Sequence, residues 1–444
     1  MSANGRVWSA VFSAKALVAL VVAVALWAQF NSGQFRAAFA NWPPGGKATL
    51  ASRFSTWDIA HYLRLSQSGY KAGSKSCAFY PLWPALIHLG TMVAGGRPVL
   101  AAMLLTNALS LLGFWMLYRL VERHCGPEVG RDSLILMLAF PGALFFSFPY
   151  SESIFFVLVL VFFWGLELER WSLVAVAGFL LPLTRPTGVF VLAPLGWRLW
   201  ERQKAERRTQ KAQRQLAEKR KAESGKQKSP LDLANNPPTH QFTSPPAHSS
   251  QNPIIQQSNN PAIQSPDTPP LQHSTTPLRP GRWLLLLCPL LGYAAYFGLM
   301  HAWTGNAFDG FAAQKSYPNS PSIANMFNYH GFTNALLNVH TLGGMMDGAL
   351  DRVFFLVFLA LLWPIYRLNK VWFWYVLPAG LVPALSSWFM SYRRYIMVLF
   401  PMFVVLALAL RKARSRWLFW YYVVLLAGLQ VWAVKQFVNF NWAG

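Results

Sequence analysis

The sequence predicts an all-α, polytopic integral membrane protein with about 10–12 membrane segments. Two observations support this fold class. The chain has 444 residues, of which 54% are hydrophobic and 12% are charged, about half of the roughly 25% charged residues usual in soluble proteins. Several windows of about 12–20 residues also carry no charge, which is enough for the core of a helix that crosses about 30 Å of hydrocarbon.

The uncharged windows are distributed along most of the chain. The first follows Arg6 and Lys15 and could be a cleaved signal peptide, but no Ala-x-Ala-like site with a soluble domain follows it, so we interpret it as the first span. Trp171–Trp197 is interrupted by prolines and a glycine, which predicts two half-helices that meet near Arg185 and line a cavity. The predicted uncharged segments are Ala16–Phe30, Val99–Tyr118, Ile154–Leu166, Trp283–Met300, Val353–Pro364, Ile396–Leu410 and Trp417–Val434.

Composition divides the chain into three parts. Residues 1–197 are predicted to form an N-terminal membrane module that includes a first extracytoplasmic loop, 31–78, and residues 282–444 a C-terminal membrane module. The insert at 198–281 begins with a basic run, with 12 Lys and Arg between Arg198 and Lys228. It continues as a Pro-, Ser-, Gln- and Asn-rich stretch that is predicted to be disordered, because it has little apolar surface to bury.

The net charge of +23 does not indicate a nucleic-acid partner. The basic residues flank membrane segments or lie in the insert, so anionic membrane lipids are the expected partner. The basic run is predicted to be cytoplasmic by the positive-inside rule. The loop that holds Asp58, the loop Gly305–Asp351 and the turn Ser386–Arg394 are then extracytoplasmic. The three cysteines lie in separate segments without CxxC spacing, which gives no disulfide framework and no metal site.

Asp58 is the first candidate for chemistry. Trp57 and Asp58 open a predicted amphipathic helix that Gly69 ends, and His61 and Tyr62 share the face of Asp58. Such a carboxylate can take a proton from a hydroxyl, and nearby basic residues, including Arg53, can hold a phosphate. The alternative is an aspartate that only stabilises a helix N-terminus.

Glu152 and Arg185 are the next candidates. Glu152 lies in an apolar stretch between Asp132 and Glu167, where an ionisable group is costly and usually functional; alternatively, Ser151 and Glu152 form a helix start. Arg185 lies in the LLPLTRPTG break, where a guanidinium can bind a phosphate through two hydrogen bonds or extend to the membrane surface.

Further polar candidates lie in the last third of the chain. Arg393 and Arg394 begin a late span, where two cations oppose the helix dipole, so a phosphate is a plausible ligand and a charge that sets topology is the alternative. Gln314, in FAAQKSYPNSP, could contact the donor or acceptor, or belong to a solvated loop.

Three blocks of the sequence resemble the PIG-V-like mannosyltransferases, which have bacterial relatives. They are STWDIAHYL with the following AFYPLWP, FPGALFFSFPYSESIFF with LLPLTRPTG, and SYRRYIMVLFP. The resemblance implies a GT-C type membrane glycosyltransferase with Asp58 as the catalytic carboxylate. It also favours a catalytic role for Glu152, which could orient the acceptor. Residues in or near these blocks are expected to contact substrate: Arg53, Trp57, His61, Tyr62, Tyr80, Tyr150, Arg185, Arg393 and Arg394.

Two features depart from the family pattern. Thr56 stands before the Trp-Asp pair, where the family often has an arginine, and Arg185-Pro186-Thr187-Gly188 replaces an Arg-Ser-Asn-Gly-like element. The donor or acceptor preference is therefore expected to differ from that of the eukaryotic enzymes.

The expected reaction is inverting transfer of a hexose, with mannose as the expected sugar, from a polyprenyl-phosphate donor to an extracytoplasmic glycan, lipid or protein hydroxyl. The candidate blocks contain no DxD or DxE pair, so no metal and no cofactor is predicted, although a divalent cation between Asp58 and Glu152 is conceivable. The expected location is a bacterial inner membrane. The alternative function is a flippase or transporter of lipid-linked sugars that performs no chemistry.

Overall fold

A computed structural model describes residues 3–27, 41–43, 50–224, 280–317, 320–413 and 416–443. Within these ranges every regular element is a helix, and the only β-type pairings are two isolated bridges, Asn41 with Thr56 and Thr341 with Gly348. The predicted all-α class is confirmed. The predicted disorder at 229–280 falls almost entirely outside the described residues, and so do residues 31–40 and 44–49 of the loop at 31–78.

The chain divides into two units. The first comprises residues 1–199 and 280–444, so segments from both predicted membrane modules pack together in one compact body. The second comprises Trp200–Arg279, of which the structure describes the charged end of helix α9.

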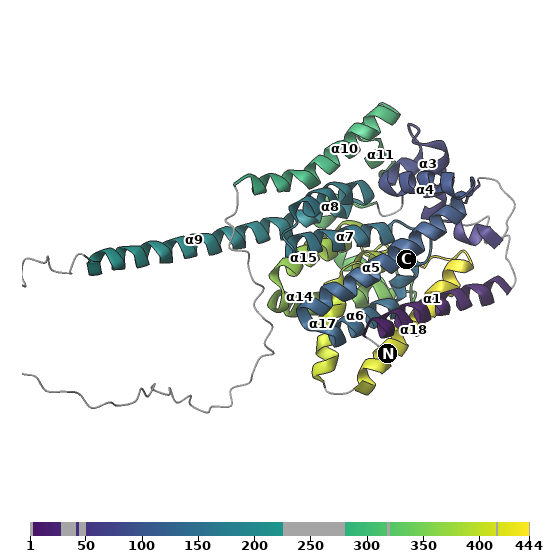
Figure 1. The fold of residues 1–444 in the computed structure, drawn as a ribbon. Helices are drawn as coiled ribbons and strands as arrows, with labels where there is room; N and C mark the ends of the chain where they lie inside the picture. Colours follow the sequence, from purple (N-terminus) through teal and green to yellow (C-terminus); the bar gives the residue numbers. More distant parts are fainter. Residues whose placement is uncertain are drawn as a thin grey trace, which may run out of the picture. The chain divides into compact units, whose positions relative to one another are not determined.

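The first unit is a bundle of helices that run mostly alongside one another (Figure 1). Its helices before the insert are α1 (Ala3–Trp27), η1 (Leu50–Phe54), α3 (Asp58–Ser68), η2 (Lys75–Ala78), α4 (Leu82–Val93), α5 (Pro98–Cys125), α6 (Pro127–Ala139), η3 (Pro141–Phe146), α7 (Glu152–Glu167), α8 (Trp171–Thr184), η4 (Pro186–Val191) and the start of α9 (Leu192–Ser224). After the insert come η6 (Pro280–Leu286), α10 (Leu287–Thr304), α11 (Asp309–Lys315), α12 (Ile323–Met326), α13 (Tyr329–Leu337), α14 (Ala349–Leu368), α15 (Lys370–Ser387), α16 (Tyr392–Ile396), α17 (Phe400–Lys412) and α18 (Arg416–Val438).

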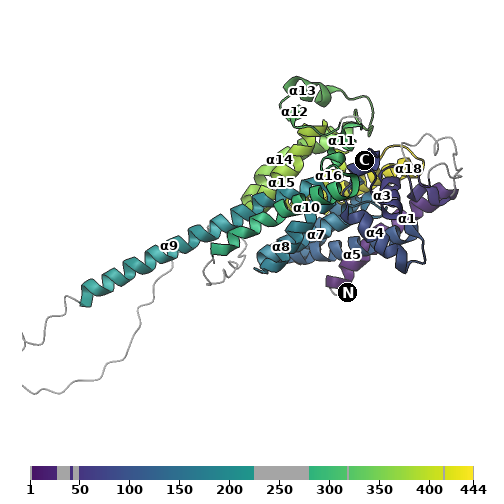
Figure 2. The same cartoon turned by 90° about the horizontal axis from the view of Figure 1, so that it is seen from above.

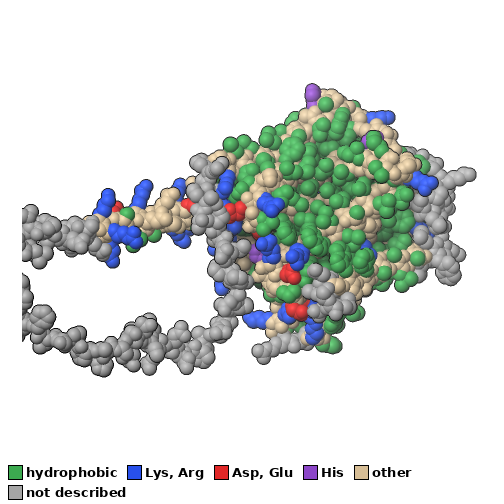
Figure 3. Space-filling model, viewed as in Figure 1, with side chains coloured by type: hydrophobic (Ala, Val, Ile, Leu, Met, Phe, Trp, Pro, Cys, Tyr) green, Lys and Arg blue, Asp and Glu red, His purple; other side chains and the backbone are tan. Residues whose placement is uncertain are grey.

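Among the residues that the structure describes, four helical segments are long and apolar enough to cross a membrane: Pro98–Cys125, Gly281–Thr304, Ala349–Leu368 and Arg416–Val438. Shorter apolar helices accompany them at Val7–Ala23, Leu82–Val93 and Trp171–Thr184. The side of the bundle seen in Figure 3 is largely hydrophobic, with most Lys and Arg side chains toward its edges. Such a surface is expected where helices face lipid, so the chain is an integral membrane protein.

Two local predictions agree with the structure. α3 begins at Asp58 and ends before Gly69, whose φ of 66° is a conformation that glycine adopts without strain. α8 ends at Thr184, and the chain bends at Arg185 before η4 continues it. Gly188 makes this break possible, because a Cβ there would lie 2.3 Å from the backbone carbonyl carbon of Leu181.

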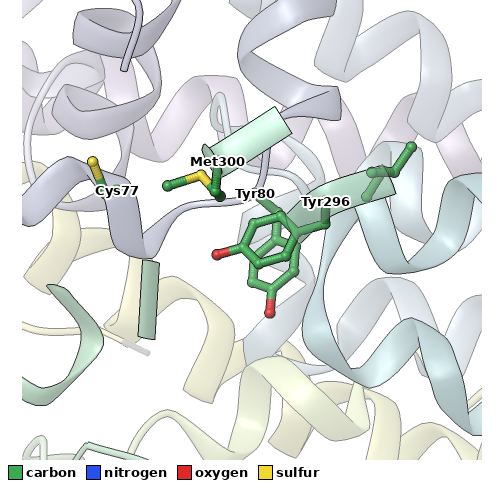
Figure 4. Packing of buried hydrophobic residues seen from close by; sticks show 5 residues of the cluster. Cys77, Tyr80, Tyr296 and Met300 are labelled. Carbon is green, nitrogen blue, oxygen red and sulfur yellow. The ribbon is translucent and has the colours of Figure 1, made fainter. Parts of the chain in front are cut away.

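One end of the bundle gathers segments that are distant in sequence. α3, α4 and α11 lie together there in both views (Figure 1 and Figure 2). A cluster of buried aromatic residues supports this end, with the ring of Tyr80 stacked on that of Tyr296 at 4.4 Å between centroids, beside Cys77 and Met300 (Figure 4). The first polar loop is therefore held against α10.

Candidate functional site

Asp58 is positioned by a strained residue at the start of α3. Trp57 has a φ of 57° and a ψ of −138°, which is uncommon for a non-glycine residue and persists only where surrounding contacts enforce it. The Trp57 indole packs edge-on against Trp442, with 5.4 Å between centroids. This conformation turns the chain into α3 so that the Asp58 carboxylate meets Arg394.

The turn before Arg394 contains further strained residues. Trp388, Phe389 and Ser391 all have positive φ, at 47°, 70° and 57°. The turn lies between α15 and the short helix α16, and two buried side chains, Phe389 and Tyr392, hold it. Strained backbone of this kind is concentrated at functional sites. Here the turn positions Arg394 against the carboxylates of Asp58 and Glu152.

Four charged side chains from four segments form a connected group, which we call the charged quartet: Asp58, Glu152, Arg185 and Arg394. Arg394 donates from Nη1 to Asp58 Oδ2 at 2.7 Å and from Nε to Glu152 Oε1 at 2.9 Å. Arg185 Nη1 lies 2.6 Å from the same Glu152 oxygen. With two carboxylates and two guanidinium groups, the formal charges cancel, which is what allows such a group to be buried.

The quartet is graded in exposure. The Glu152 side chain is fully buried, Arg394 is 6% exposed, Arg185 is 12% exposed and Asp58 is 23% exposed. Glu152 Oε2 is buried and has no hydrogen-bond partner within the part of the chain that the structure describes. Asp58 is thus the member most accessible to a substrate, and Glu152 retains one oxygen that can accept a further hydrogen bond.

Aromatic side chains enclose the quartet. The Arg394 guanidinium lies over the rings of Phe145 and Tyr150, at 4.8 and 4.7 Å, and that of Arg185 lies 5.2 Å from the Tyr395 ring. Aromatic faces attract cations, most strongly where water is excluded. Both arginines are thus held in fixed orientations before any substrate arrives.

Tyr62 links α3 to the start of α7. Its hydroxyl lies 3.1 Å from Ser151 Oγ, next to Glu152. Burial raises the pKa of Tyr62, with the nearby carboxylates of Glu152 and Asp58 adding to the effect, so its hydroxyl stays protonated and available as a donor. Tyr62 therefore points toward the start of α7.

His61 forms a chain of contacts on the other side of Asp58. His61 Nδ1 lies 2.9 Å from Ser76 Oγ, and His61 Nε2 lies 3.2 Å from the hydroxyl of Tyr317. The same hydroxyl donates to the carbonyl oxygen of Lys75 at 3.2 Å, and the imidazole stacks on Phe79 with 4.7 Å between centroids. Tyr317 therefore ties the segment after α11 to the helix that carries Asp58.

We predict that His61 makes the fold sensitive to mild acid. Burial lowers the pKa of His61 from its usual 6.5 to about 4, so as the pH falls through this window the unfolded chain binds a proton that the folded chain does not. Stability is present above pH 6.5 and falls below it, by about 3 kcal/mol at pH 4.

Unfolding midpoints of the detergent-solubilised protein, measured from pH 7 to pH 5, check this prediction. The matched variant is His61→Gln, which keeps hydrogen-bonding capacity but does not titrate in this range. We expect the acid-dependent decrease to be smaller in the variant. Equal decreases in the two proteins would exclude His61 as its source.

The remaining predicted site residues lie on other elements of the fold. Arg53 is fully buried on η1. Tyr80 belongs to the aromatic cluster with Tyr296. Gln314 lies on α11, half-buried, three residues before Tyr317. The structure therefore brings Trp57, His61, Tyr62, Tyr150, Arg185 and Arg394 together around Asp58 and Glu152.

Arg393 faces away from the quartet. Its Nε donates to Asp351 Oδ1 at 3.1 Å, its backbone N–H donates to the same oxygen at 2.9 Å, and both side chains are buried. The two neighbouring arginines therefore have different partners, and Arg393 links the turn to the first turn of α14.

We predict a structural role for this second pair. Asp351→Asn leaves a buried guanidinium without its carboxylate, which should lower the free energy of unfolding by about 3 kcal/mol. The protein that remains folded should keep the KM of the wild type for its donor. Thermal unfolding and donor titration of the same preparation measure both quantities. An unchanged stability with a raised donor KM would instead place Arg393 in the binding site.

Sequence reasoning missed three residues that complete this region. Tyr317 contacts His61 across 256 positions of the chain, Ser151 contacts Tyr62, and Asp351 neutralises Arg393. Asp351 had a detectable signal, since an acidic residue at the start of an apolar helix requires a cationic partner. Tyr317 had none, because its partner is set only by how α11 packs on η2.

Comparison with known proteins gives one family. Residues 46–222 match the family model described as Mannosyltransferase (PIG-V). No curated protein and no solved structure matches the chain. The matched range contains the first two sequence blocks with Asp58, Glu152 and Arg185, and it leaves out the third block with Arg394. The resemblance to the PIG-V mannosyltransferases is thereby confirmed over residues 46–222, and this integral membrane protein is a glycosyltransferase.

Proposed function

We propose that this glycosyltransferase moves a hexose, with mannose as the expected sugar, from a polyprenyl-phosphate donor to an extracytoplasmic acceptor hydroxyl with inversion. The observation that carries the proposal is the charged quartet. In it Arg394 binds two carboxylates, the partly exposed carboxylate of Asp58 and the fully buried carboxylate of Glu152. The proposed class is GT-C, and the proposed location is a bacterial inner membrane with the site facing outward.

Asp58 is the proposed general base. Its carboxylate accepts the proton of the acceptor hydroxyl while that oxygen forms a bond to the anomeric carbon, and the bond from that carbon to the phosphate oxygen breaks on the opposite face. Positioned base catalysis contributes typically about 10²–10⁴ in rate. Because the polyprenyl phosphate leaves as a stable anion, it requires cations rather than a strong acid.

Arg185 and Arg394 are the proposed cations for the leaving phosphate. Both are held by Glu152 and by aromatic rings, so they need little reorganisation when negative charge develops on the phosphate. Glu152 is then a residue that positions both arginines. Its Oε2, which has no hydrogen-bond partner among the described residues, is a proposed acceptor for the hydrogen bond of a sugar hydroxyl. The acceptor substrate is proposed to be a glycan, a lipid or a protein.

A donor panel tests the reaction. The purified protein in liposomes would be given polyprenyl-phosphate mannose, glucose and galactose together with a membrane lipid extract as the source of acceptor. We expect a sugar to appear in a new glycosidic bond, with the opposite anomeric configuration to the donor by NMR. Retention of configuration would contradict the single-displacement mechanism. Movement of the intact donor across the liposome without any product, for every sugar, would favour the flippase function.

A further inference from the structure

The segment between α11 and α14 carries an apolar surface that the proposed reaction does not use. Four side chains of α12, α13 and the residues joining them are strongly exposed: Ile323 at 76%, Phe327 at 71%, Tyr329 at 78% and Leu337 at 80%. We call these four residues the outer face. Side chains of this size rarely stand exposed together on a soluble surface without a partner.

The opposite side of the same segment is packed against the turn that carries Arg394. Phe332 lies 5.3 Å from Phe389 between ring centroids, and a Cβ on Gly331 would come within 2.7 Å of the Trp388 ring. Asn325 Nδ2 donates to the carbonyl oxygen of Ser386 at 2.7 Å. The side of the segment opposite the outer face is thus fixed to the turn that carries Arg394. The outer face is the side left without a protein partner among the described residues.

The chemistry of the segment fits a bilayer surface better than bulk water. Between Asp309 and Asp347 the sequence has a single Asp, Glu, Lys or Arg residue, Lys315. Tyrosine and phenylalanine beside uncharged polar side chains such as Asn334 are typical of the membrane interface, where apolar bodies enter the acyl region and polar groups remain at headgroup level.

The outer face is also continuous with a surface that must meet lipid. α14 is one of the described helices that are long and apolar enough to cross the membrane, and it exposes Val353 and Leu356 near its start. Arg352, in the first turn of α14, donates from Nη2 to the carbonyl oxygen of Ala335 in α13 at 2.7 Å. The end of α13 therefore adjoins the first turns of a lipid-exposed helix, and Figure 2 shows α12 and α13 beyond the ends of α14 and α15.

We infer that the outer face of α12–α13 is a lipid-binding surface that rests in the interfacial layer of the bilayer. The occupant is the phospholipid of the surrounding leaflet. The opposite side of α12–α13 packs against the Trp388–Arg394 turn. Contact of the outer face with lipid therefore holds this turn at a fixed depth in the membrane, near the level of the lipid phosphate groups. This contact with the membrane does not depend on which sugar is transferred.

Photolabelling of the full chain tests this inference. The protein would be placed in nanodiscs with a phospholipid that carries a diazirine near the headgroup end of its acyl chain, and adducts would be mapped by mass spectrometry. We expect adducts on Ile323, Phe327 and Leu337 as strong as those on Val353 and Leu356, the internal reference. Adducts on α14 alone would overturn the inference.

Two matched variants sharpen the test. Phe327→Asp adds a charge to the outer face without removing buried packing, and it should abolish the adducts on α12–α13 while leaving those on α14. Asn328→Asp adds the same charge one residue later, and an aspartate can still accept the bond from the Gly331 N–H that Asn328 accepts. We expect wild-type labelling with Asn328→Asp. Unchanged labelling in Phe327→Asp would contradict a lipid-bound outer face.

Discussion

Asp58→Asn is expected to lower kcat by about 10²–10⁴ while leaving the protein folded and inserted. The amide keeps the size of the side chain but cannot accept a proton from the acceptor hydroxyl. Arg394 retains its contacts with Glu152 at 2.8 and 2.9 Å, and Asp58 is the most exposed member of the quartet, so we expect only a small change in the unfolding midpoint. Turnover and thermal unfolding of one purified preparation measure both effects.

A matched control separates the chemistry from a general loss of negative charge. Asp347→Asn changes an aspartate that accepts from Thr341 Oγ1, away from the quartet, and it should retain wild-type turnover. If Asp58→Asn turned over at the wild-type rate, Asp58 would not be the base. If it unfolded, the loss of activity would carry no information about catalysis, and Asp58→Glu would then be the variant to measure.

Glu152→Gln is expected to show a large effect of a different kind, because it removes the carboxylate that Arg185 and Arg394 share. Two buried guanidinium groups then lose their main counter-charge, and breaking a buried ion pair in this way costs about 3–5 kcal/mol. We expect a lowered unfolding midpoint and, in the protein that remains folded, a raised KM for the donor because both arginines are released from their positions.

The control for Glu152→Gln is Glu122→Gln. Glu122 pairs with Arg119 at 2.8 Å, and 44% of the Arg119 side chain and 24% of the Glu122 side chain are exposed. A glutamine can still accept the hydrogen bond from the Tyr118 hydroxyl, so the loss of this pair should cost about 1 kcal/mol or less. Equal destabilisation by the two substitutions would show that the burial of Glu152 confers no special role. Wild-type stability and activity of Glu152→Gln would contradict the proposal that Glu152 positions Arg185 and Arg394.

The parts of the fold that depend on local sequence could be predicted. Apolar windows predicted the helices, the Trp57–Gly69 pattern predicted α3, and two prolines with a glycine predicted the break at Arg185. These features follow from the preferences of neighbouring residues for helix, turn or apolar surroundings. The same reasoning identified Asp58, Glu152 and Arg185 separately, as polar residues in or beside apolar segments.

Pairing between segments could not be predicted. Asp58 and Arg394 are separated by 336 positions, and local patterns cannot say which cation meets which carboxylate. Arg393 and Arg394 illustrate the limit. Neighbouring residues on a helix point in directions about 100° apart, so one meets Asp351 and the other meets Asp58 and Glu152. The strained turn before them determines which of the two arginines faces Asp351 and which faces Asp58 and Glu152.

Transfer of radiolabel from polyprenyl-phosphate mannose, in membranes that contain wild-type or Asp58→Asn protein in equal amount, shows whether Asp58 is the base. We expect label to enter a new product with wild type and to stay on the donor lipid with Asp58→Asn. Equal product formation by the two proteins would contradict the assignment of Asp58 as the base.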